Sequence, residues 1–256
     1  GTGKTMLARA LRAILPPLSR AQALAVTAIH SQTLGEVEIS TRPPFRSPHH
    51  TASHTALVGG GSNPKPGEVT LAHHGVLFMD EFPEFERRSL DALRQPLEDK
   101  VVSIARVQGS AEFPADFILV AALNPYRGTF DGTTDLARAM QETYKNKVSG
   151  PILDRIDLWL EVPHVDYETL TSLKTKTGET KDARALVTTA RDRAAKRKAT
   201  HLEMPETNNN LSARDIENNI YLNEAVKDLL KISSARLNLS PRSYHRLIKV
   251  ARTIAD

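Results

Sequence analysis

The first five residues have the composition of half a phosphate-binding loop. Gly1-Thr2-Gly3-Lys4-Thr5 supplies glycines that let backbone N–H groups close on a phosphate, a lysine for the β and γ phosphates, and a hydroxyl that can bind Mg²⁺. The complete pattern is G-x-x-x-x-G-K-[ST], so we expect its first glycine to precede residue 1. Taken alone, these residues also fit a glycine turn before an ordinary amphipathic helix. With Met6, which follows directly, they form the predicted nucleotide-binding segment.

Two neighbouring acids supply the second part of the same chemistry. Asp80 and Glu81 follow the apolar run Val76–Met79, which is typical of a strand buried on both faces. At the end of such a strand a P-loop enzyme holds Mg²⁺ through a carboxylate, a role that suits Asp80, while Glu81 can polarise an attacking water. Two acids can also simply end a strand. Their occurrence together with the lysine-threonine pair favours the catalytic interpretation.

Asn124 and Arg155 are candidates for completing the site. Asn124 ends the next apolar strand, where its amide could hold the water or sense the γ-phosphate, although Asn before Pro also begins turns for structural reasons. Arg155 is placed to reach a neighbouring subunit's γ-phosphate and stabilise transition-state charge. An ion pair with Asp154 or Asp157 is the alternative.

Arg242 opens the last predicted helix, where the helix dipole disfavours a cation, so we expect it to face an anion. Arg246, one turn further on, is the second choice. Histidines at 49, 50, 54, 73 and 74 raise the question of zinc. The first cluster lacks a nearby acidic ligand and imidazoles also serve loops and phosphates, so we predict no zinc site.

Alternating strands and helices followed by helices alone predict an α/β domain and then a helical one. We expect an α/β core over residues 1–163, a Thr- and Lys-rich linker over 164–182 and a helical domain over 183–256. The expected strands are 76–79, 117–123 and 157–162, with a hairpin of 101–104 and 111–113 that turns at Gly109-Ser110. The expected helices are 6–15, 19–32, 85–97, 212–219, 223–237 and 240–256. Residues 42–74, rich in proline and glycine, read as a functional insertion.

Composition excludes several classes of protein. Charged residues are 25% and hydrophobic ones 40% of the 256 residues, as in an ordinary globular protein. No apolar run is long enough to cross a membrane and no export signal is visible. The absence of cysteine excludes disulfides and thiolate metal sites and fits the cytoplasm. The net charge is only +4, but basic residues cluster between 181 and 198. Such a cluster can bind DNA phosphates or can form a solvated helix face.

Six motifs together resemble one protein family. Besides the two described above, they are Arg46-Ser47-Pro48-His49-His50, Val58-Gly59-Gly60-Gly61-Ser62-Asn63-Pro64, Arg94-Gln95-Pro96-Leu97-Glu98-Asp99 and the segment Ser149–Asp157. The set resembles the magnesium-chelatase-like branch of the AAA+ ATPases, in particular the YifB/ComM family of competence-associated proteins. The likeness runs over the whole chain and is most specific between Arg46 and Asp99.

The resemblance implies a P-loop AAA+ fold with a helical lid, and an ATP-driven, Mg²⁺-dependent homohexameric ring. Lys4 and Thr5 correspond to Walker A, Asp80 and Glu81 to Walker B, and Asn124 to the first sensor. Arg155 matches the arginine finger, and Arg242 the second sensor on the lid. Residues 42–74 and the hairpin match insertions directed toward the pore.

The resemblance also implies a role: a DNA helicase for branch migration of single-stranded or branched DNA during integration of incoming DNA. A protein-remodelling motor of the chelatase type is the alternative, and a nucleotide-gated DNA-binding module with little turnover is a third. Two features depart from the family. Tyr126–Phe130 stands where relatives commonly carry cysteines, and the amino-terminal domain, the first strand and the start of Walker A are expected to be missing.

Overall fold

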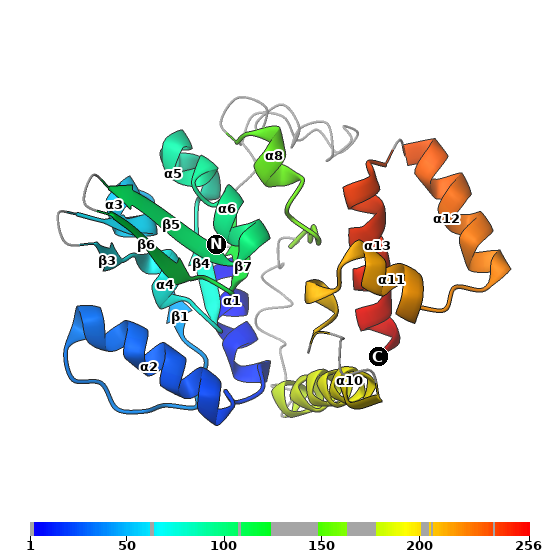
Figure 1. Cartoon of the computed structure of the whole chain (residues 1–256), viewed down its shortest axis with the longest axis horizontal. Coiled ribbons are helices and arrows are strands. Elements are labelled where there is room, and N and C mark those ends of the chain that lie inside the picture. The colour runs from blue at the N-terminus through cyan, green and yellow to red at the C-terminus, as the bar shows by residue number, and fades with distance from the viewer. Residues whose placement is uncertain are drawn as a thin grey trace, which may run out of the picture. The chain divides into compact units, whose positions relative to one another are not determined.

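A computed structural model describes residues 3–61, 64–106, 109–123, 148–162, 178–200, 205, 207–237 and 239–256. The chain divides into two compact units (Figure 1). Unit 1 comprises residues 1–156 and 160–175, and unit 2 comprises 157–159 and 176–256. Unit 1 is a mixture of strands and helices, whereas the described part of unit 2 is helical. The α/β fold class predicted from the sequence is confirmed.

The described elements of each unit follow in chain order. The helices of unit 1 are α1 (Lys4–Ile14), α2 (Arg20–Leu34), α3 (His54–Val58), α4 (Glu68–Leu71), the 3₁₀ helix η1 (Phe82–Glu84), α5 (Arg87–Asp91), α6 (Arg94–Asp99) and α8 (Gly150–Leu153). Its strands are β1 (Phe45–Arg46), β2 (Gly59–Gly60), β3 (Lys65–Pro66), β4 (Val76–Met79), β5 (Val101–Arg106), β6 (Gly109–Pro114) and β7 (Ile118–Ala121). Unit 2 contains α10 (Glu179–Thr200), η2 (Asn208–Asn210), α11 (Ala213–Asn219), α12 (Glu224–Leu237) and α13 (Pro241–Ala255).

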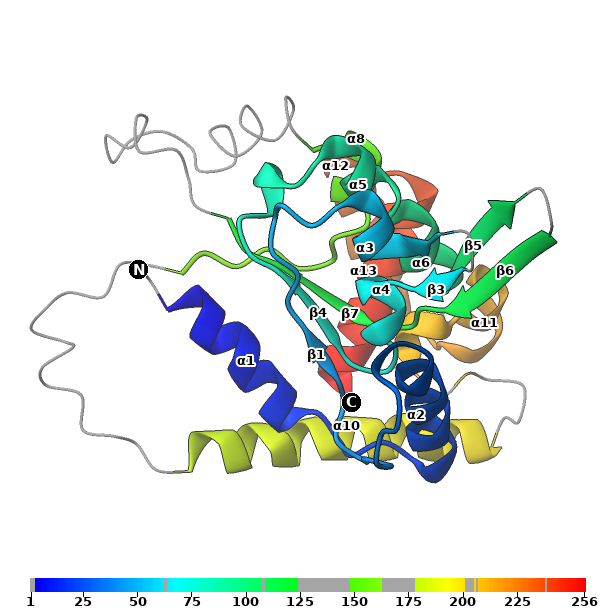
Figure 2. The same cartoon turned by 90° about the vertical axis from the view of Figure 1, so that its left-hand side faces the viewer.

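A parallel sheet with the strand order β1-β4-β7 is the centre of unit 1 (Figure 2). All four residues of β4 are buried, as the apolar run predicts. The predicted strand at 117–123 is shorter, and its side chains are only partly buried because β7 is an edge of the described sheet. The two-residue strand β1 lies in the segment that the sequence assigns to an insertion. Prolines on either side and the short length hide it from pattern analysis.

The approach of β1 to β4 requires glycine at position 75. The Val76 N–H donates to the Pro44 carbonyl oxygen at 2.9 Å, and the Ile118 N–H donates to the Gly75 carbonyl oxygen at 2.9 Å. A Cβ on Gly75 would lie 2.1 Å from the Pro44 oxygen. Gly75 therefore lets the three strands begin in register.

Most predicted helices of unit 1 are present, but one is broken. Ser19 begins α2 with a reciprocal capping box to Gln22, as the sequence indicates. The continuous helix predicted over 85–97 is wrong, because the chain forms two short helices there, α5 and α6. Pro96 has no N–H to give to the Ala92 carbonyl, so it is tolerated only in the first turn of a new helix, where it stands in α6.

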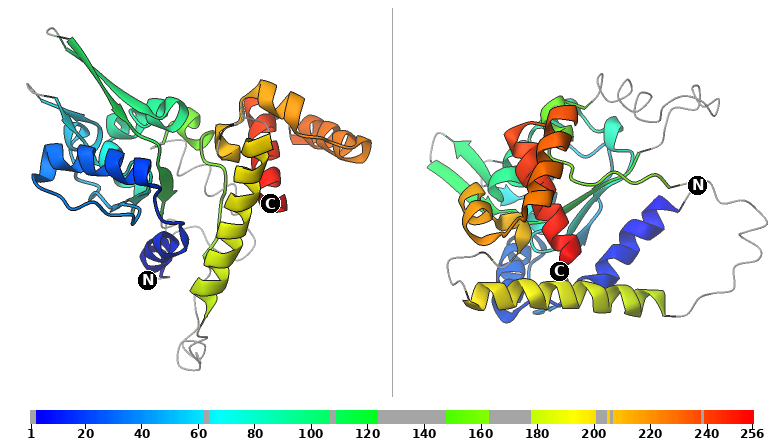
Figure 3. Two further views of the ribbon diagram at one scale, coloured as in Figure 1. Left: turned by 60° about the horizontal axis from the view of Figure 1, so that its bottom comes forward. Right: turned by 90° about the vertical axis from the view of Figure 1, so that its right-hand side faces the viewer.

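The predicted hairpin forms, with a different turn. Strands β5 and β6 pair from Val101↔Pro114 to Arg106↔Gly109, so Gly109 and Ser110 belong to the second strand rather than to the turn. Figure 3 (left) shows the two strands extending outward from unit 1.

The strand predicted over 157–162 is wrong, because these residues have no regular secondary structure. An apolar alternating pattern becomes a strand only when a neighbouring strand takes its hydrogen bonds, and none of the described strands pairs with it. Leu158, Trp159 and Leu160 remain exposed.

Unit 2 has a small core of its own. Leu211, Ile216 and Ile248 are buried together, with Tyr244 packed against them. Ser212 caps α11 and Ser240 caps α13, and Pro241 occupies the first turn of α13, where its missing N–H costs nothing. The three helices predicted over 212–219, 223–237 and 240–256 are confirmed. Within the described residues of both units, no helix is at once long and apolar enough to span a membrane.

Replacing Gly75 by alanine should lower the free energy of unfolding by roughly 2–3 kcal/mol, because the new Cβ overlaps the Pro44 carbonyl. Urea denaturation measures the change. Gly150→Ala is the control, since a Cβ there meets open space. Equal unfolding midpoints for the two variants would contradict the close approach.

His73 should make the stability of unit 1 fall with decreasing pH. Burial, helped by His74 and Lys100 and opposed by Asp116, lowers the pKa of His73 from 6.5 to about 4. Its Nδ1 accepts the Asp116 N–H at 3.0 Å, which requires the ring nitrogen to be unprotonated.

Between these pKa values the unfolded chain binds a proton that the native chain does not, so lowering the pH favours unfolding. From pH 7.5 to 5 the free energy of unfolding should fall by about 2 kcal/mol more in the parent chain than in His73→Gln. Urea titrations at both pH values test this. Parallel losses in the two proteins would exclude His73 as the cause.

Candidate nucleotide and magnesium site

The start of α1 is an uncapped helix N-terminus. Gly3 is its N-cap residue, with φ 77° and ψ 10°, a left-handed conformation that suits glycine, and no side chain caps the first turn. The first N–H groups of an α-helix have no partner within the helix and carry the positive end of its dipole. Lys4 and Thr5 are the first two residues of this helix. The terminus is therefore suited to a phosphate group.

The sheet brings the predicted magnesium ligands together. The Thr5 hydroxyl donates to Asp80 Oδ2 at 2.9 Å across 75 residues. Helix α1 reaches the end of β4 because Ala8 is buried against Phe78 of that strand. A hydroxyl and a carboxylate are the oxygen ligands that Mg²⁺ prefers, so this pair fits the ion.

Glu81 is held in an uncommon backbone conformation. It has φ 52° and ψ 43°, a region that residues other than glycine rarely occupy. Its N–H donates to Asp80 Oδ1 at 3.0 Å, and the following residue, Phe82, is fully buried and donates its N–H to the Ala122 oxygen at 2.9 Å. These contacts maintain a strain of order 1–3 kcal/mol and point the half-exposed Glu81 carboxylate away from the core.

His50 contacts the candidate base. Its Nδ1 lies 3.0 Å from Glu81 Oε2. His50 follows β1, and β1 runs parallel to β4, so both residues emerge at the same edge of the sheet. The neighbouring His49 ring lies against the His50 ring and its Nδ1 contacts the Thr51 hydroxyl at 2.8 Å. The sequence analysis considered these histidines as zinc ligands, predicted no zinc site and missed the contact with Glu81, because nothing in the pattern pairs position 50 with position 81.

Arg155 forms neither of the ion pairs that the sequence suggested. Its guanidinium donates to Glu98 of α6 and, at 2.6 Å, to the Pro151 carbonyl oxygen. The alternative pairs with Asp154 and Asp157 are thus replaced by a partner 57 residues away.

The two candidate arginines of α13 lie in unit 2. Arg242 occupies the first turn and is exposed. Arg246 Nε donates to Asp157 at 2.6 Å, so this second choice is engaged within its own unit. Since the residues near α1 and β4 belong to unit 1, the place of Arg242 beside the phosphates stays a prediction.

Part of the basic cluster of α10 faces inward. Arg197 donates to Asp256 and to the Asn208 side chain at 2.9 Å, and Arg193 donates to the Asp256 backbone oxygen. The Asp256 side chain is fully buried. These two arginines therefore stabilise unit 2, and the outward cations of the helix are fewer than the sequence suggests.

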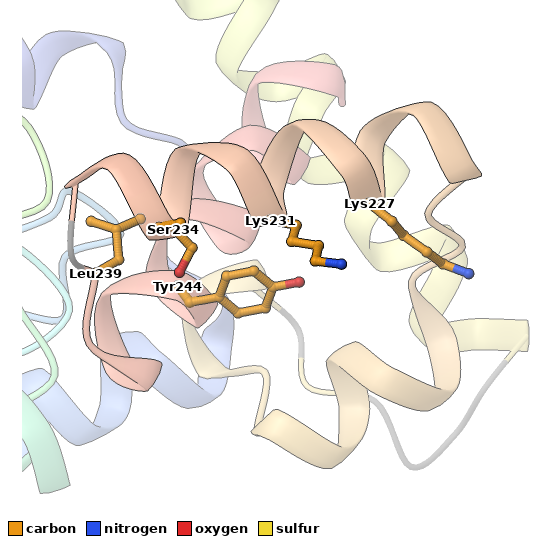
Figure 4. A pocket seen from close by; sticks show the side chains of 6 residues that line it. Lys227, Lys231, Ser234, Leu239 and Tyr244 are labelled. Carbon is orange, nitrogen blue, oxygen red and sulfur yellow. The ribbon is translucent and has the colours of Figure 1, made fainter.

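Unit 2 also has an open hollow of about 500 Å³ between α12 and the start of α13. Figure 4 shows Lys231 and Tyr244 on its wall, and Lys227 at one end. Lys227 is paired with Glu224 at 2.7 Å. None of the predicted site residues lines this hollow.

Of the predicted site residues, the structure brings Thr5, Asp80 and Glu81 together. Lys4 begins the same helix as Thr5, and Met6 follows on it with an exposed side chain. Gly1, Thr2 and Asn124 lie outside the described residues. In the described part of the chain no three His, Asp or Glu side chains are grouped as a metal site.

Comparisons with known proteins show the family of the chain. Residues 1–170 match the family described as "Magnesium chelatase, subunit ChlI", and residues 177–256 match "Magnesium chelatase, subunit ChlI C-terminal". The chain is 43% identical over 261 residues to "Competence protein ComM" of Haemophilus influenzae and 44% identical over 260 residues to "Uncharacterized protein YifB" of Escherichia coli.

Both alignments cover 100% of this chain and 50% of the relative, so the chain spans about half the length of these proteins. A shorter stretch of 93 residues, 36% of the chain and 11% of the relative, is 32% identical to "DNA replication licensing factor Mcm6" of Drosophila melanogaster. Membership of an AAA+-related family implies the use of nucleotide and Mg²⁺ in general terms. The chain belongs to the magnesium chelatase ChlI family of AAA+-type proteins, in the group that contains ComM and YifB.

Proposed function

We propose that this chain is the motor part of an ATP-hydrolysing AAA+ ring that acts on DNA. The observation that carries the ATPase proposal is the contact of Thr5 with Asp80 beside an uncapped helix N-terminus. The DNA proposal is supported by the similarity of the whole chain to half of ComM, a competence protein, and by the shorter similarity to the replication factor Mcm6. In this proposal the role is helicase or branch-migration activity.

Each residue has a distinct role in the proposed reaction. Thr5 and Asp80 hold Mg²⁺, which when bound would neutralise phosphate charge. Lys4 and the N–H groups at the start of α1, with the preceding Gly1, Thr2 and Gly3, hold the phosphates. Glu81 takes a proton from the attacking water, and Asn124 orients that water.

Two arginines that do not belong to unit 1 of the same subunit complete the proposed site. Arg242 holds the γ-phosphate from the helical unit of the same chain. Arg155 acts on the nucleotide of a neighbouring subunit and stabilises charge in the transition state, so hydrolysis depends on assembly into a homohexamer.

A protein-remodelling motor is the second candidate function. The family description, a magnesium chelatase subunit, favours it, since such a motor would drive a partner protein rather than DNA. Stimulation of hydrolysis by DNA separates the two proposals.

Steady-state ATP hydrolysis should rise several-fold when branched or single-stranded DNA is added. The measurement uses a version of the chain that carries the complete phosphate-loop pattern, and Glu81→Gln is the blank because it keeps shape but cannot take the proton. We expect turnover of the blank to fall by at least about 100-fold. Robust activity that ignores DNA would favour the protein-remodelling motor, and negligible turnover in the parent would leave a nucleotide-gated binding module.

His50→Ala should lower kcat for hydrolysis by about tenfold while KM for ATP stays within about twofold, because the carboxylate of Glu81 loses the contact that fixes its direction. His49→Ala is the matched control, since this ring contacts Thr51 rather than Glu81. The same kinetic change in both variants would show that the loop as a whole, and not the Glu81 contact, is responsible.

A further inference from the structure

The Arg155 guanidinium is neutralised within its own subunit. One terminal nitrogen donates to Glu98 and the other to the Pro151 carbonyl oxygen at 2.6 Å. The Arg155 side chain is only 12% exposed, whereas that of Glu98 is 46% exposed. In this conformation the positive charge lies against a carboxylate rather than open to an incoming anion.

The backbone that carries Arg155 is firmly anchored. Ile152 of α8 is fully buried in the main core of unit 1. At the start of α8, the Ser149 hydroxyl donates to Asp91 at 2.6 Å and accepts from Arg94 at 3.0 Å. A change in the contacts of Arg155 therefore requires movement of its side chain and not of the segment.

When Arg155 is paired with Glu98, not every nitrogen of its guanidinium has a hydrogen-bond acceptor. Its Nε atom is buried and has no hydrogen-bond acceptor in the described structure. A buried donor without an acceptor loses its hydration and gains nothing in return. A second conformation in which all three guanidinium nitrogens have acceptors would compete with the conformation paired to Glu98. A phosphate offers the acceptors for it.

We propose that Glu98 is a positioning residue that restrains Arg155 in the separate subunit, and that the γ-phosphate of a neighbour's nucleotide replaces Glu98 on assembly. This inference rests on the proposed role of Arg155 in trans. A carboxylate and a phosphate are both anions, so they compete for one guanidinium instead of sharing it. Breaking the Glu98 contact is then part of the free energy of ring assembly.

Glu98→Gln should favour assembly, because it removes the competing charge and keeps the shape. The protein concentration for half-maximal ring formation, measured by sedimentation with a slowly hydrolysed ATP analogue, should fall by about threefold to fivefold. The concentration for half-maximal ATPase activity should fall in parallel. Asp99→Asn is the control: Asp99 is exposed on the same helix and forms no ion pair with a residue that the structure describes.

Arg155→Ala distinguishes a failure of the proposed trans role of Arg155 from a failure of the restraint by Glu98. If hydrolysis in Arg155→Ala equals that of the parent, the proposed trans role is wrong. If hydrolysis collapses in Arg155→Ala but Glu98→Gln assembles like the parent or less readily, only the restraint by Glu98 is wrong. The same holds if the Glu98→Gln shift in assembly persists unchanged in the Arg155→Ala background, whereas its disappearance there supports the coupling.

Discussion

The position of β4 between β1 and β7 is the constraint on which the site depends. Parallel strands end at the same edge of a sheet, so the residues that follow β1 and β4, His50 and Glu81, meet there, and Ala122 at the end of β7 receives the N–H of Phe82. The burial of every β4 side chain supplies the apolar free energy that holds this order. Gly75 permits it, because a side chain at position 75, directly before β4, would overlap Pro44.

The same packing explains why the acids can sit in a strained turn. Glu81 is held in the left-handed region because the chain is fixed before it, at Met79 in the buried strand, and after it, at Phe82 in the core. A relaxed turn would release the strain but would also move the Glu81 carboxylate. The strained backbone therefore costs stability and in return fixes the direction of this carboxylate. Helix α1 completes the arrangement by packing Ala8 on Phe78, which delivers the Thr5 hydroxyl to Asp80.

Local patterns in the sequence are enough to predict candidate site residues but not their partners. The strand at 76–79 can be predicted because burial on both faces requires a continuous apolar run. Serine caps such as those of α2, α11 and α13 depend on residues next to one another in the sequence, because capping is local. Strand β1 has two residues and no pattern. The contacts of His50 with Glu81 and of Arg155 with Glu98 join distant segments through the fold. The strand expected at 157–162 failed because a strand needs a partner, which periodicity does not reveal.

The ion pairs of the arginines show which cations stabilise unit 2. Arg246 is engaged with Asp157 and Arg197 with Asp256, so these cations stabilise unit 2 in the described structure. Unit 1 by itself offers a hydroxyl, two carboxylates and the lysine of α1 near one helix N-terminus. Four phosphate charges of ATP exceed what one Mg²⁺ and one lysine neutralise, so the proposed reaction needs further cations from elsewhere. In the proposed function Arg242 and, from a neighbouring subunit, Arg155 would supply them, so hydrolysis would depend on the assembly of the ring.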